Sequence, residues 1–148
     1  MIGVIGGSSV DAATYRLAQE VGRGIAERGA ILITGGMGGV MEAASRGAKD
    51  AGGLVVGILP GSEASEANPW VDVPIVTGMS HARNTIIART AQALIAVDGS
   101  YGTLSEIAFA LIFSKPVIGL QTWEIDPRIH RAENAEHAVE MAFALLKP

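Results

Sequence analysis

The chain has 148 residues, of which 49% are hydrophobic and 18% charged, and its formal net charge is −4. This length favours a single domain over residues 1–148 with a sizeable core, and the composition excludes a disordered chain. The acidic balance argues against nucleic acid as a partner. A chain without cysteine has no disulfide, cysteine-ligated zinc or cysteine nucleophile.

Short runs rich in valine, isoleucine and leucine alternate with segments of helical spacing. The runs predict strands near residues 1–6, 30–34, 53–58, 71–76, 92–97 and 116–120. The intervening segments predict helices over residues 12–28, 39–51, 80–91, 103–114 and 132–146. Asp11 is expected to cap the first helix and Gly29 to end it, and residues 61–69 and 121–131 are expected to form surface loops.

This alternation predicts an α/β fold with one doubly wound, mainly parallel sheet of about six strands and helices on both faces. The strands lack alternation of apolar and polar residues, which is typical of strands covered on both faces. In such a sheet ligands bind beyond the C-terminal ends of the strands, where the winding reverses and helix N-termini present free N–H groups. A phosphate or another anion is therefore the expected ligand.

Two glycine-rich turns follow the first two predicted strands. In GGSSVD, Gly7 brings the backbone close to a ligand and Ser8 offers a hydroxyl, but a tight turn capped by Asp11 explains the segment equally well. In TGGMGGVMEAA, four glycines in five residues exceed what one turn requires. This abundance favours close approach to a ligand, with another strand or a subunit as the alternative neighbour. Neither turn has the GxGxxG or Walker A spacing.

The third turn, GMSHARN, carries a cation at the start of a predicted helix. Ser80 is expected to cap that helix, which places Arg83 in its first turn. Because a cation is unfavourable near a helix N-terminus, we expect Arg83 to meet an anion, either a ligand phosphate or a structural carboxylate. Asn84 is a candidate to orient Arg83 or a sugar hydroxyl.

The fourth turn, GSYGTLSE, ends on a carboxylate. Thr103 and Glu106 have the spacing of a capping box, which explains both residues without a ligand but leaves Gly99–Gly102 unexplained. A carboxylate so close to a helix N-terminus is expected to have a lowered pKa and to be ionised at neutral pH.

Together, MSHARN and GSYGTLSE resemble the paired signature of the LOG family, whose second motif reads PGGxGTxxE. The positions that match this motif are Gly99, Gly102, Thr103 and Glu106. Asp98 stands in place of the motif's proline and Ser100 in place of its second glycine, and Arg83 falls on the family's arginine. The glycine block of residues 35–44 is also similar to a family block, one residue shorter, so the resemblance spans nearly the whole chain.

This resemblance implies a Rossmann-like nucleotide-binding domain that hydrolyses the N-glycosidic bond of a nucleoside 5′-monophosphate. Arg83 and Glu106 would be catalytic, with the phosphate on the amides of Gly102 and Thr103. Glu106 would stabilise an oxocarbenium-like ribose or help water attack, and Arg83 would orient Glu106 and the sugar or phosphate. The short length and the ARN and GVMEAA segments look closer to a subgroup related to molybdenum-cofactor carrier proteins, which implies a non-catalytic carrier or sensor as the alternative.

The predicted site thus has two catalytic residues, Arg83 and Glu106. Its predicted ligand- and phosphate-binding residues are Gly7, Ser8, Gly35, Gly36, Gly38, Gly39, Met79, Asn84, Gly99, Ser100, Tyr101, Gly102 and Thr103. No metal and no required cofactor is expected, although a bound nucleotide or a molybdopterin-type ligand is compatible. A pyridoxal-phosphate decarboxylase is disfavoured because it needs a lysine at the ligand edge, and Lys49, Lys115 and Lys147 are predicted elsewhere.

Three further expectations concern partners and location. The predicted helix that contains IAFALIF is apolar all round, which favours burial against a second copy and hence a homodimer or larger oligomer. Trp123 is a candidate to stack on a base or pterin, with an exposed or interface tryptophan as the alternative. No apolar run approaches the roughly 18 residues of a membrane span, so we expect a cytoplasmic protein without a membrane partner.

Overall fold

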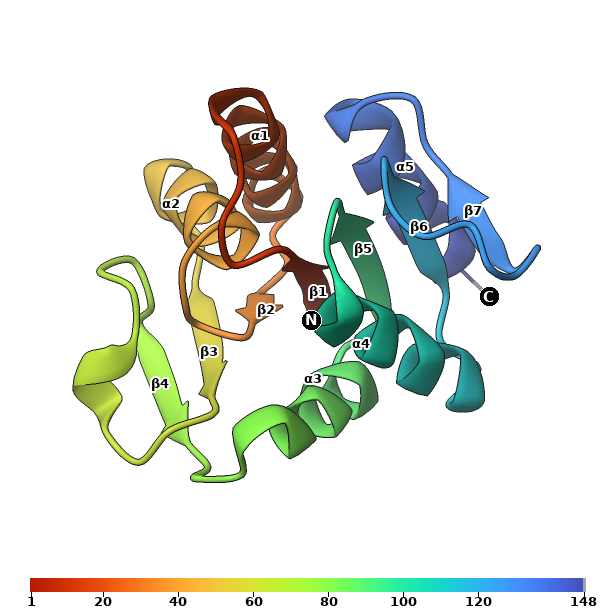
Figure 1. The fold of residues 1–148 in the computed structure, drawn as a ribbon. Helices are drawn as coiled ribbons and strands as arrows, with labels where there is room; N and C mark the ends of the chain where they lie inside the picture. Colours follow the sequence, from red (N-terminus) through yellow and green to blue (C-terminus); the bar gives the residue numbers. More distant parts are fainter. Residues whose placement is uncertain (148) are drawn as a thin grey trace.

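The computed structural model describes residues 1–147 and shows a central sheet with helices on both faces (Figure 1). The strands in this part of the chain are β1 (Ile2–Gly6), β2 (Leu32–Thr34), β3 (Val55–Leu59), β4 (Val73–Val76), β5 (Ala93–Val97), β6 (Val117–Leu120) and β7 (Ile129–Arg131). They form one sheet in the order β4-β3-β2-β1-β5-β6-β7, and each neighbouring pair is parallel. The predicted α/β class and parallel sheet are confirmed.

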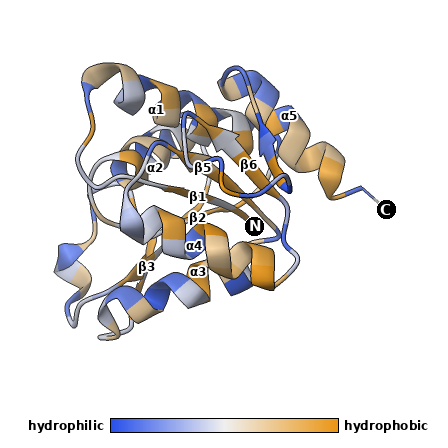
Figure 2. Ribbon diagram, turned by 45° about the vertical axis from the view of Figure 1, so that its right-hand side comes forward, coloured by the Kyte–Doolittle hydropathy of each residue, from blue (hydrophilic) through white to orange (hydrophobic). Residues whose placement is uncertain are grey.

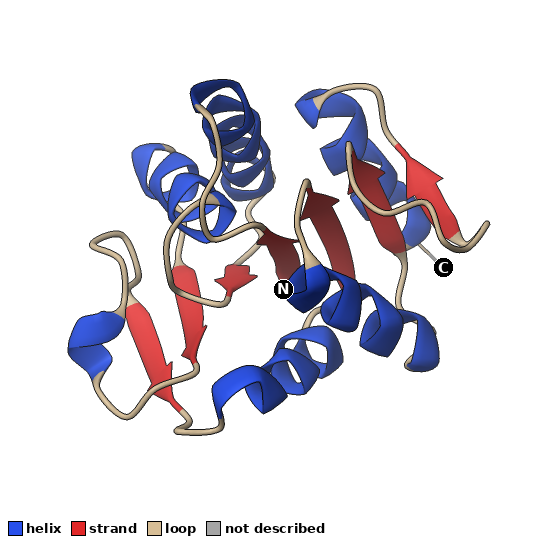
Figure 3. Ribbon diagram, viewed as in Figure 1, coloured by secondary structure: helices blue, strands red, loops and turns tan. Residues whose placement is uncertain are grey.

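Helices cover the sheet in two groups, as Figures 1 and 3 show. The α-helices are α1 (Ala12–Glu27), α2 (Val40–Asp50), α3 (Asn84–Thr90), α4 (Tyr101–Ile112) and α5 (Ala135–Leu145), and two 3₁₀ helices are η1 (Ala64–Glu66) and η2 (Ser80–Arg83). One face carries α1, α2 and α5, and the other carries α3 and α4. Each face has its own hydrophobic core, and the strands between the two cores are among the most hydrophobic parts of the ribbon (Figure 2).

The strand order defines where the winding reverses. The chain builds β1 to β4 outward in one direction and then returns to place β5 on the other side of β1. The reversal therefore lies between β1 and β5, and a crevice beyond their C-terminal ends is where such sheets bind ligands. Two of the glycine-rich turns and the N-terminus of α4 follow directly after these two strands.

Two strands depart from the prediction. The sheet has a seventh strand, β7, within the stretch of residues 121–131 that was expected to be a loop. Only one of its three residues is apolar, and it pairs at the sheet edge, so no apolar run marks it in the sequence. All four residues of β4 are exposed, so coverage on both faces was the wrong expectation for this edge strand.

Some of the predicted helix ends and caps are confirmed, and others are wrong. Asp11 caps α1, with its carboxylate 2.8 Å from the amide of Thr14, and Gly29 follows the helix with a φ of +75°. Ser80, by contrast, caps nothing: it lies inside η2 with a φ of +53°, and residues 80–91 divide into η2 and α3. The helix predicted over residues 103–114 is α4, which begins at Tyr101 and ends at Ile112, each two residues earlier than predicted.

The apolar helix α4 is not buried all round. Its buried residues lie along one face that packs toward the sheet and α3, whereas Tyr101 and Ile112 are 79% and 69% exposed. The homodimer or larger oligomer expected through this helix therefore stays a prediction. Among the helices of residues 1–147, none has the length and apolar character to cross a bilayer.

Candidate functional site

The first two glycine-rich turns pack on one another at the C-terminal edge of the sheet. The amide of Val40 donates to the carbonyl of Gly7 at 2.9 Å. Gly39 has a φ of +63°, and a Cβ there would overlap the carbonyl oxygen of Gly7. Gly36 has a φ of +76°, and a Cβ there would lie 2.6 Å from Leu59 Cδ2. Close packing inside the protein thus accounts for these glycines, which favours the alternative of a protein neighbour over a ligand.

Two other predicted residues of this region, Ser8 and Gly38, lie where the two turns meet. Ser8 is exposed, and a Cβ at Gly38 would come 3.2 Å from its carbonyl oxygen. Asp98, at the end of β5, reaches the same place, because its Oδ2 lies 3.7 Å from the Cβ position of Gly7. The structure therefore brings the turns after β1, β2 and β5 together, as the topology predicts.

Arg83 lies beneath these turns as a buried cation that is 8% exposed. Its Nε donates to the carbonyl of Ile58 at 2.9 Å, Nη2 donates to the carbonyl of Gly35 at 3.5 Å, and Nη1 donates to Asn84 Oδ1. These acceptors are neutral, and no ion pair involves Arg83 within residues 1–147. Burial lowers the pKa of the guanidinium, and the nearby Glu106 carboxylate raises it. A buried charge without a close counter-ion is costly, so this position suits an anion.

Asn84 connects Arg83 to the first turn of α4. Its Nδ2 donates to Ser105 Oγ at 3.0 Å and to the carbonyl of Gly102 at 3.4 Å, and Ser105 Oγ donates to the same carbonyl at 2.6 Å. Asn84 is buried, and these bonds give it a positioning role within the protein. Sequence reasoning missed Ser105, although a serine that bonds back along a helix by three residues is a recognisable pattern.

The N-terminus of α4 is open toward solvent. Ser100 is the N-cap residue and its side chain makes no cap hydrogen bond, while its carbonyl accepts from Leu104 at 3.0 Å. The amides of Gly102 and Thr103 come before that first helical bond and are free of it. A Cβ at Gly102 would meet no atom of the described residues within 4 Å. This glycine therefore borders open space, and an anion can approach the amides beside it.

The predicted capping box is not formed. Thr103 lies inside α4, where its side chain is buried against Gly99; a Cβ at Gly99, which has a φ of +109°, would overlap that side chain. Gly99 is thus required by Thr103 packing. Glu106 follows Thr103 by one turn on the same face, and helical side chains tilt toward the helix N-terminus. The Cα–Cβ bond of Glu106 is therefore directed toward the turn that precedes α4.

Glu106 is 7% exposed. Burial raises the pKa of Glu106 to about 8, and the positive charge of Arg83 opposes that rise. The pKa of Glu106 is therefore raised, whereas the sequence predicted a lowered pKa. The helix dipole weakens beyond the first turn, so desolvation outweighs it at this depth.

Two predicted residues lie at the margin of this group. Met79 is exposed in the turn after β4, and three strands separate β4 from β5. Tyr101 begins α4 and points outward, with its ring centroid 5.9 Å from that of Trp123. Trp123 Nε1 donates to the carbonyl of Ser100 at 3.0 Å, which holds this tryptophan beside the N-terminus of α4.

A pocket of about 360 Å³ is lined in part by Trp123. Its lining comes from the end of β6, from β7 and from the segment between them. Sequence reasoning singled out only Trp123 here, because the pocket depends on the pairing of β7 with β6. The pocket adjoins the predicted site without including its glycine turns.

A doubly wound parallel sheet with an open helix N-terminus at its reversal point, together with the buried residues Arg83 and Glu106, agrees with the LOG-type resemblance of the sequence motifs. The chain belongs to the SLOG cluster4 family, whose model matches residues 1–145. It is 50% identical over 138 residues to an uncharacterized protein of Archaeoglobus fulgidus, covering 93% of this chain and 91% of the relative.

More distant relatives carry a named activity. The chain is 39% identical over 94 residues to the cytokinin riboside 5′-monophosphate phosphoribohydrolase LOG of Oryza sativa subsp. japonica. That match covers 61% of this chain and 38% of the rice enzyme, so the chain spans well under half of the enzyme's length.

Solved structures of two molybdenum-cofactor proteins are similar over nearly the whole chain. The molybdenum cofactor binding protein of Rippkaea orientalis has a TM-score of 0.93 at 36% identity, covering 99% of this chain and 96% of that one. The molybdenum cofactor carrier protein of Chlamydomonas reinhardtii has a TM-score of 0.91 at 38% identity, with 98% and 96% covered. Both the phosphoribohydrolases and the molybdenum-cofactor proteins are therefore relatives of this chain.

Proposed function

We propose that this chain binds a nucleoside 5′-monophosphate at the reversal point of the sheet and hydrolyses its N-glycosidic bond. The observation that carries the proposal is Glu106, a buried carboxylate one turn below an open helix N-terminus and coupled in charge to Arg83. The similarity to the rice phosphoribohydrolase supports the same substrate class.

The phosphate of this ligand would lie on the amides of Gly102 and Thr103. Helix N-termini favour anions through their free N–H groups and partial positive charge. Gly102 leaves the space above these amides open, and the buried charge of Arg83 adds an attraction for the anion.

Glu106 would act as a proton donor, because its raised pKa keeps it largely protonated at neutral pH. As the bond between C1′ and the base nitrogen breaks, the proton of Glu106 passes to that nitrogen. A water oxygen then bonds to C1′ and its proton returns to Glu106, giving free base and ribose 5-phosphate. Arg83 would stabilise the carboxylate formed in between, because its charge favours the ionised form of Glu106.

A second candidate function is the non-catalytic binding of a phosphorylated pterin such as the molybdenum cofactor. The observation that favours it is the extent of similarity: the molybdenum-cofactor proteins match at least 98% of the chain, whereas the rice enzyme matches 61%. Asp98 and Ser100 also replace two residues of the LOG motif at the proposed phosphate site. In this function the amides of Gly102 and Thr103 would hold the phosphate without turnover.

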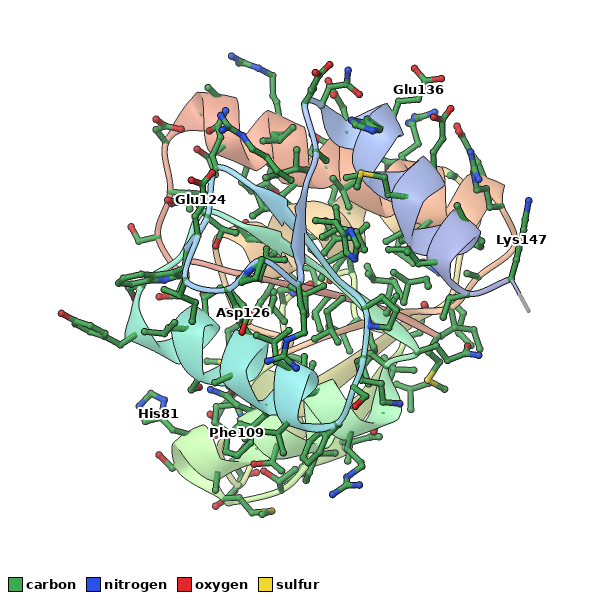
Figure 4. All side chains as sticks on the ribbon, turned by 90° about the vertical axis from the view of Figure 1, so that its right-hand side faces the viewer. His81, Phe109, Glu124, Asp126, Glu136 and Lys147 are labelled. Atoms are coloured by element: carbon green, nitrogen blue, oxygen red, sulfur yellow. The ribbon has the colours of Figure 1, made fainter. Side chains whose placement is uncertain are left out.

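Incubation with AMP, GMP, CMP and UMP, followed by chromatography of the free bases, separates the two functions. The hydrolase predicts base release from at least one nucleotide, at least a hundredfold slower in Glu106→Gln. Glu136→Gln is the matched control, because this exposed carboxylate lies on α5, away from α4 (Figure 4), and is expected to leave the rate unchanged. Nucleotide binding without base release would contradict hydrolysis and support the carrier.

A further inference from the structure

The pocket beside Trp123 is joined to the N-terminus of α4 by two hydrogen bonds. Thr122 Oγ1 donates to the carbonyl of Asp98 at 2.7 Å, and Trp123 Nε1 donates to the carbonyl of Ser100 at 3.0 Å. These two carbonyls flank Gly99, immediately before the proposed phosphate site. The wall of the pocket is therefore fixed to the same turn that presents the free amides.

The chemistry of the pocket fits a flat, partly polar group. Its apolar part includes Gly119, Ile125 and Ile129, and Trp123 forms an aromatic wall. Its polar lining comes from Gln121, Thr122, Glu124, Asp126 and Arg131, of which Arg131 pairs with Glu124 at 3.6 Å. Ligand pockets commonly have volumes of about 300–1,000 Å³ and combine an apolar lining with a few polar groups. The volume of about 360 Å³ is consistent with a group the size of a nucleotide ring system with its sugar.

Apolar side chains are also exposed to solvent at the rim of the pocket. Ile125 is 55% exposed in the segment between β6 and β7, and Tyr101 projects from the start of α4 beside Trp123. Figure 4 shows Glu124 and Asp126 on the same segment, so charged side chains alternate with the apolar ones at this opening. Exposed apolar residues beside a pocket with a polar rim are typical of a binding site.

We propose that this pocket binds the planar heterocycle, a purine or pterin ring, of the ligand whose phosphate lies on α4. The inference rests on the proposed binding of a phosphorylated ligand at Gly102 and Thr103. Trp123 supplies a face for stacking, and Gln121 and Arg131 supply hydrogen-bond partners for the ring edge. Because Trp123 bonds to the carbonyl of Ser100, the ring would lie beside the first turn of α4 and near the phosphate.

The test compares the dissociation constants of AMP, GMP and ribose 5-phosphate by calorimetry. Guanine shares the amino-oxo pyrimidine edge of a pterin, so GMP reports on that class of ring. The unaltered protein is expected to bind a nucleotide at least tenfold more tightly than ribose 5-phosphate, because stacking of one base contributes roughly that factor or more. Trp123→Leu is expected to remove that gain while leaving ribose 5-phosphate affinity unchanged, which also shows that the variant is folded.

Two further variants separate stacking from support of the helix. Trp123→Phe keeps an aromatic ring but loses the hydrogen bond to Ser100, and it is expected to retain most of the nucleotide affinity. Trp70→Leu is the matched control, because Trp70 packs beside Arg46 in another part of the molecule, and it is expected to change neither affinity.

Each other outcome overturns the inference. If Trp123→Leu weakens both ligands equally, or if Trp123→Phe is as weak as Trp123→Leu, Trp123 only supports the turn. If ribose 5-phosphate binds as tightly as the nucleotides, the pocket holds no ring while the proposed phosphate site stands. If none of the three ligands binds, the proposed phosphorylated-ligand site fails and this inference fails with it.

Discussion

Two glycine-rich turns at the same edge of the sheet, Gly35–Gly39 and Gly99–Gly102, have different reasons for their glycines. In the first turn, Gly36 and Gly39 have positive φ angles and no room for a Cβ, because neighbouring protein atoms fill that space. In the second turn, Gly99 has the same reason, because Thr103 fills its Cβ position at a positive φ, whereas Gly102 is helical and faces open space. The number of glycines in a turn therefore does not predict a ligand site. The space around each glycine Cα shows whether protein atoms or a ligand could occupy the position of a Cβ.

The same contrast extends to the charged groups. The first turn lies over Arg83, which donates to the carbonyl of Gly35, so its backbone already has a protein partner. The second turn leads to Glu106, whose side chain is largely buried and whose pKa is raised by that burial. The Gly35–Gly39 turn is therefore packed against protein atoms. The Gly99–Gly102 turn has free backbone amides and open space, so it is the better candidate for ligand binding.

The largest expected change in stability comes from a substitution in the Gly35–Gly39 turn. Gly39→Ala adds a Cβ that overlaps the carbonyl of Gly7 at a positive φ, and it is expected to lower the free energy of unfolding by about 3–5 kcal/mol. Gly52→Ala is the matched control, because Gly52 has a φ of +76° with no atom of residues 1–147 near its Cβ position; a loss of about 1–2 kcal/mol is expected. Equal losses in urea unfolding would show that packing is not the reason for Gly39.

The next effect concerns the pH dependence of stability. The folded-state pKa of Glu106 is about 8, above its ordinary value of 4.5, so the unfolded chain releases this proton first as the pH rises. The contribution of Glu106 to stability is therefore fully present below pH 4.5 and is lost as the pH rises to about 8. The slope in that window is at most about 1.4 kcal/mol per pH unit.

Glu106→Gln removes this titration. The variant is expected to be more stable than the unaltered protein at pH 8, with a flatter stability profile between pH 5 and 8 in urea unfolding. Glu136→Gln, an exposed carboxylate on α5, is expected to leave the profile unchanged. A profile that keeps its slope in Glu106→Gln would contradict a buried, protonated Glu106.

The smallest effect on stability is expected in the second turn. Gly102→Ala places a methyl group in open space within a helix, so it is expected to raise the free energy of unfolding by about 0.5–1 kcal/mol. The same methyl group stands beside the proposed phosphate site, so ribose 5-phosphate affinity is expected to fall. If Gly102→Ala lowers the free energy of unfolding, or leaves the affinity for ribose 5-phosphate unchanged, Gly102 does not differ from the packed glycines of the first turn in the way proposed.

The sequence supports the features that depend on neighbouring residues or on a simple alternation. The cap by Asp11 needs only the next turn of helix, and the parallel sheet follows from strand and helix alternation. The position of the reversal, between β1 and β5, depends on the strand order and is known only from the structure. The position of β7 likewise depends on pairing with β6. A three-residue strand with one apolar side chain carries no pattern of its own.

The chemistry of the site depends on contacts between distant segments. The motif places Arg83 and Glu106 in the sequence, but the raised pKa of Glu106 comes from burial in the folded protein. The sequence offered Asn84 to orient either Arg83 or a sugar hydroxyl, and Asn84 does accept a hydrogen bond from Arg83. Its bond to Ser105, which joins α3 to α4, could not be predicted from the sequence. Which residue holds the site and which meets the ligand is therefore decided by tertiary packing.

The most direct test of the central claim is a titration of the ¹⁵N-labelled protein with ribose 5-phosphate, followed through its amide NMR signals. The account predicts that the largest shifts belong to Gly102 and Thr103, with smaller shifts at Gly36 and Gly39. Shifts that are largest in the Gly35–Gly39 turn, or absent from α4, would contradict a phosphate site at the N-terminus of α4.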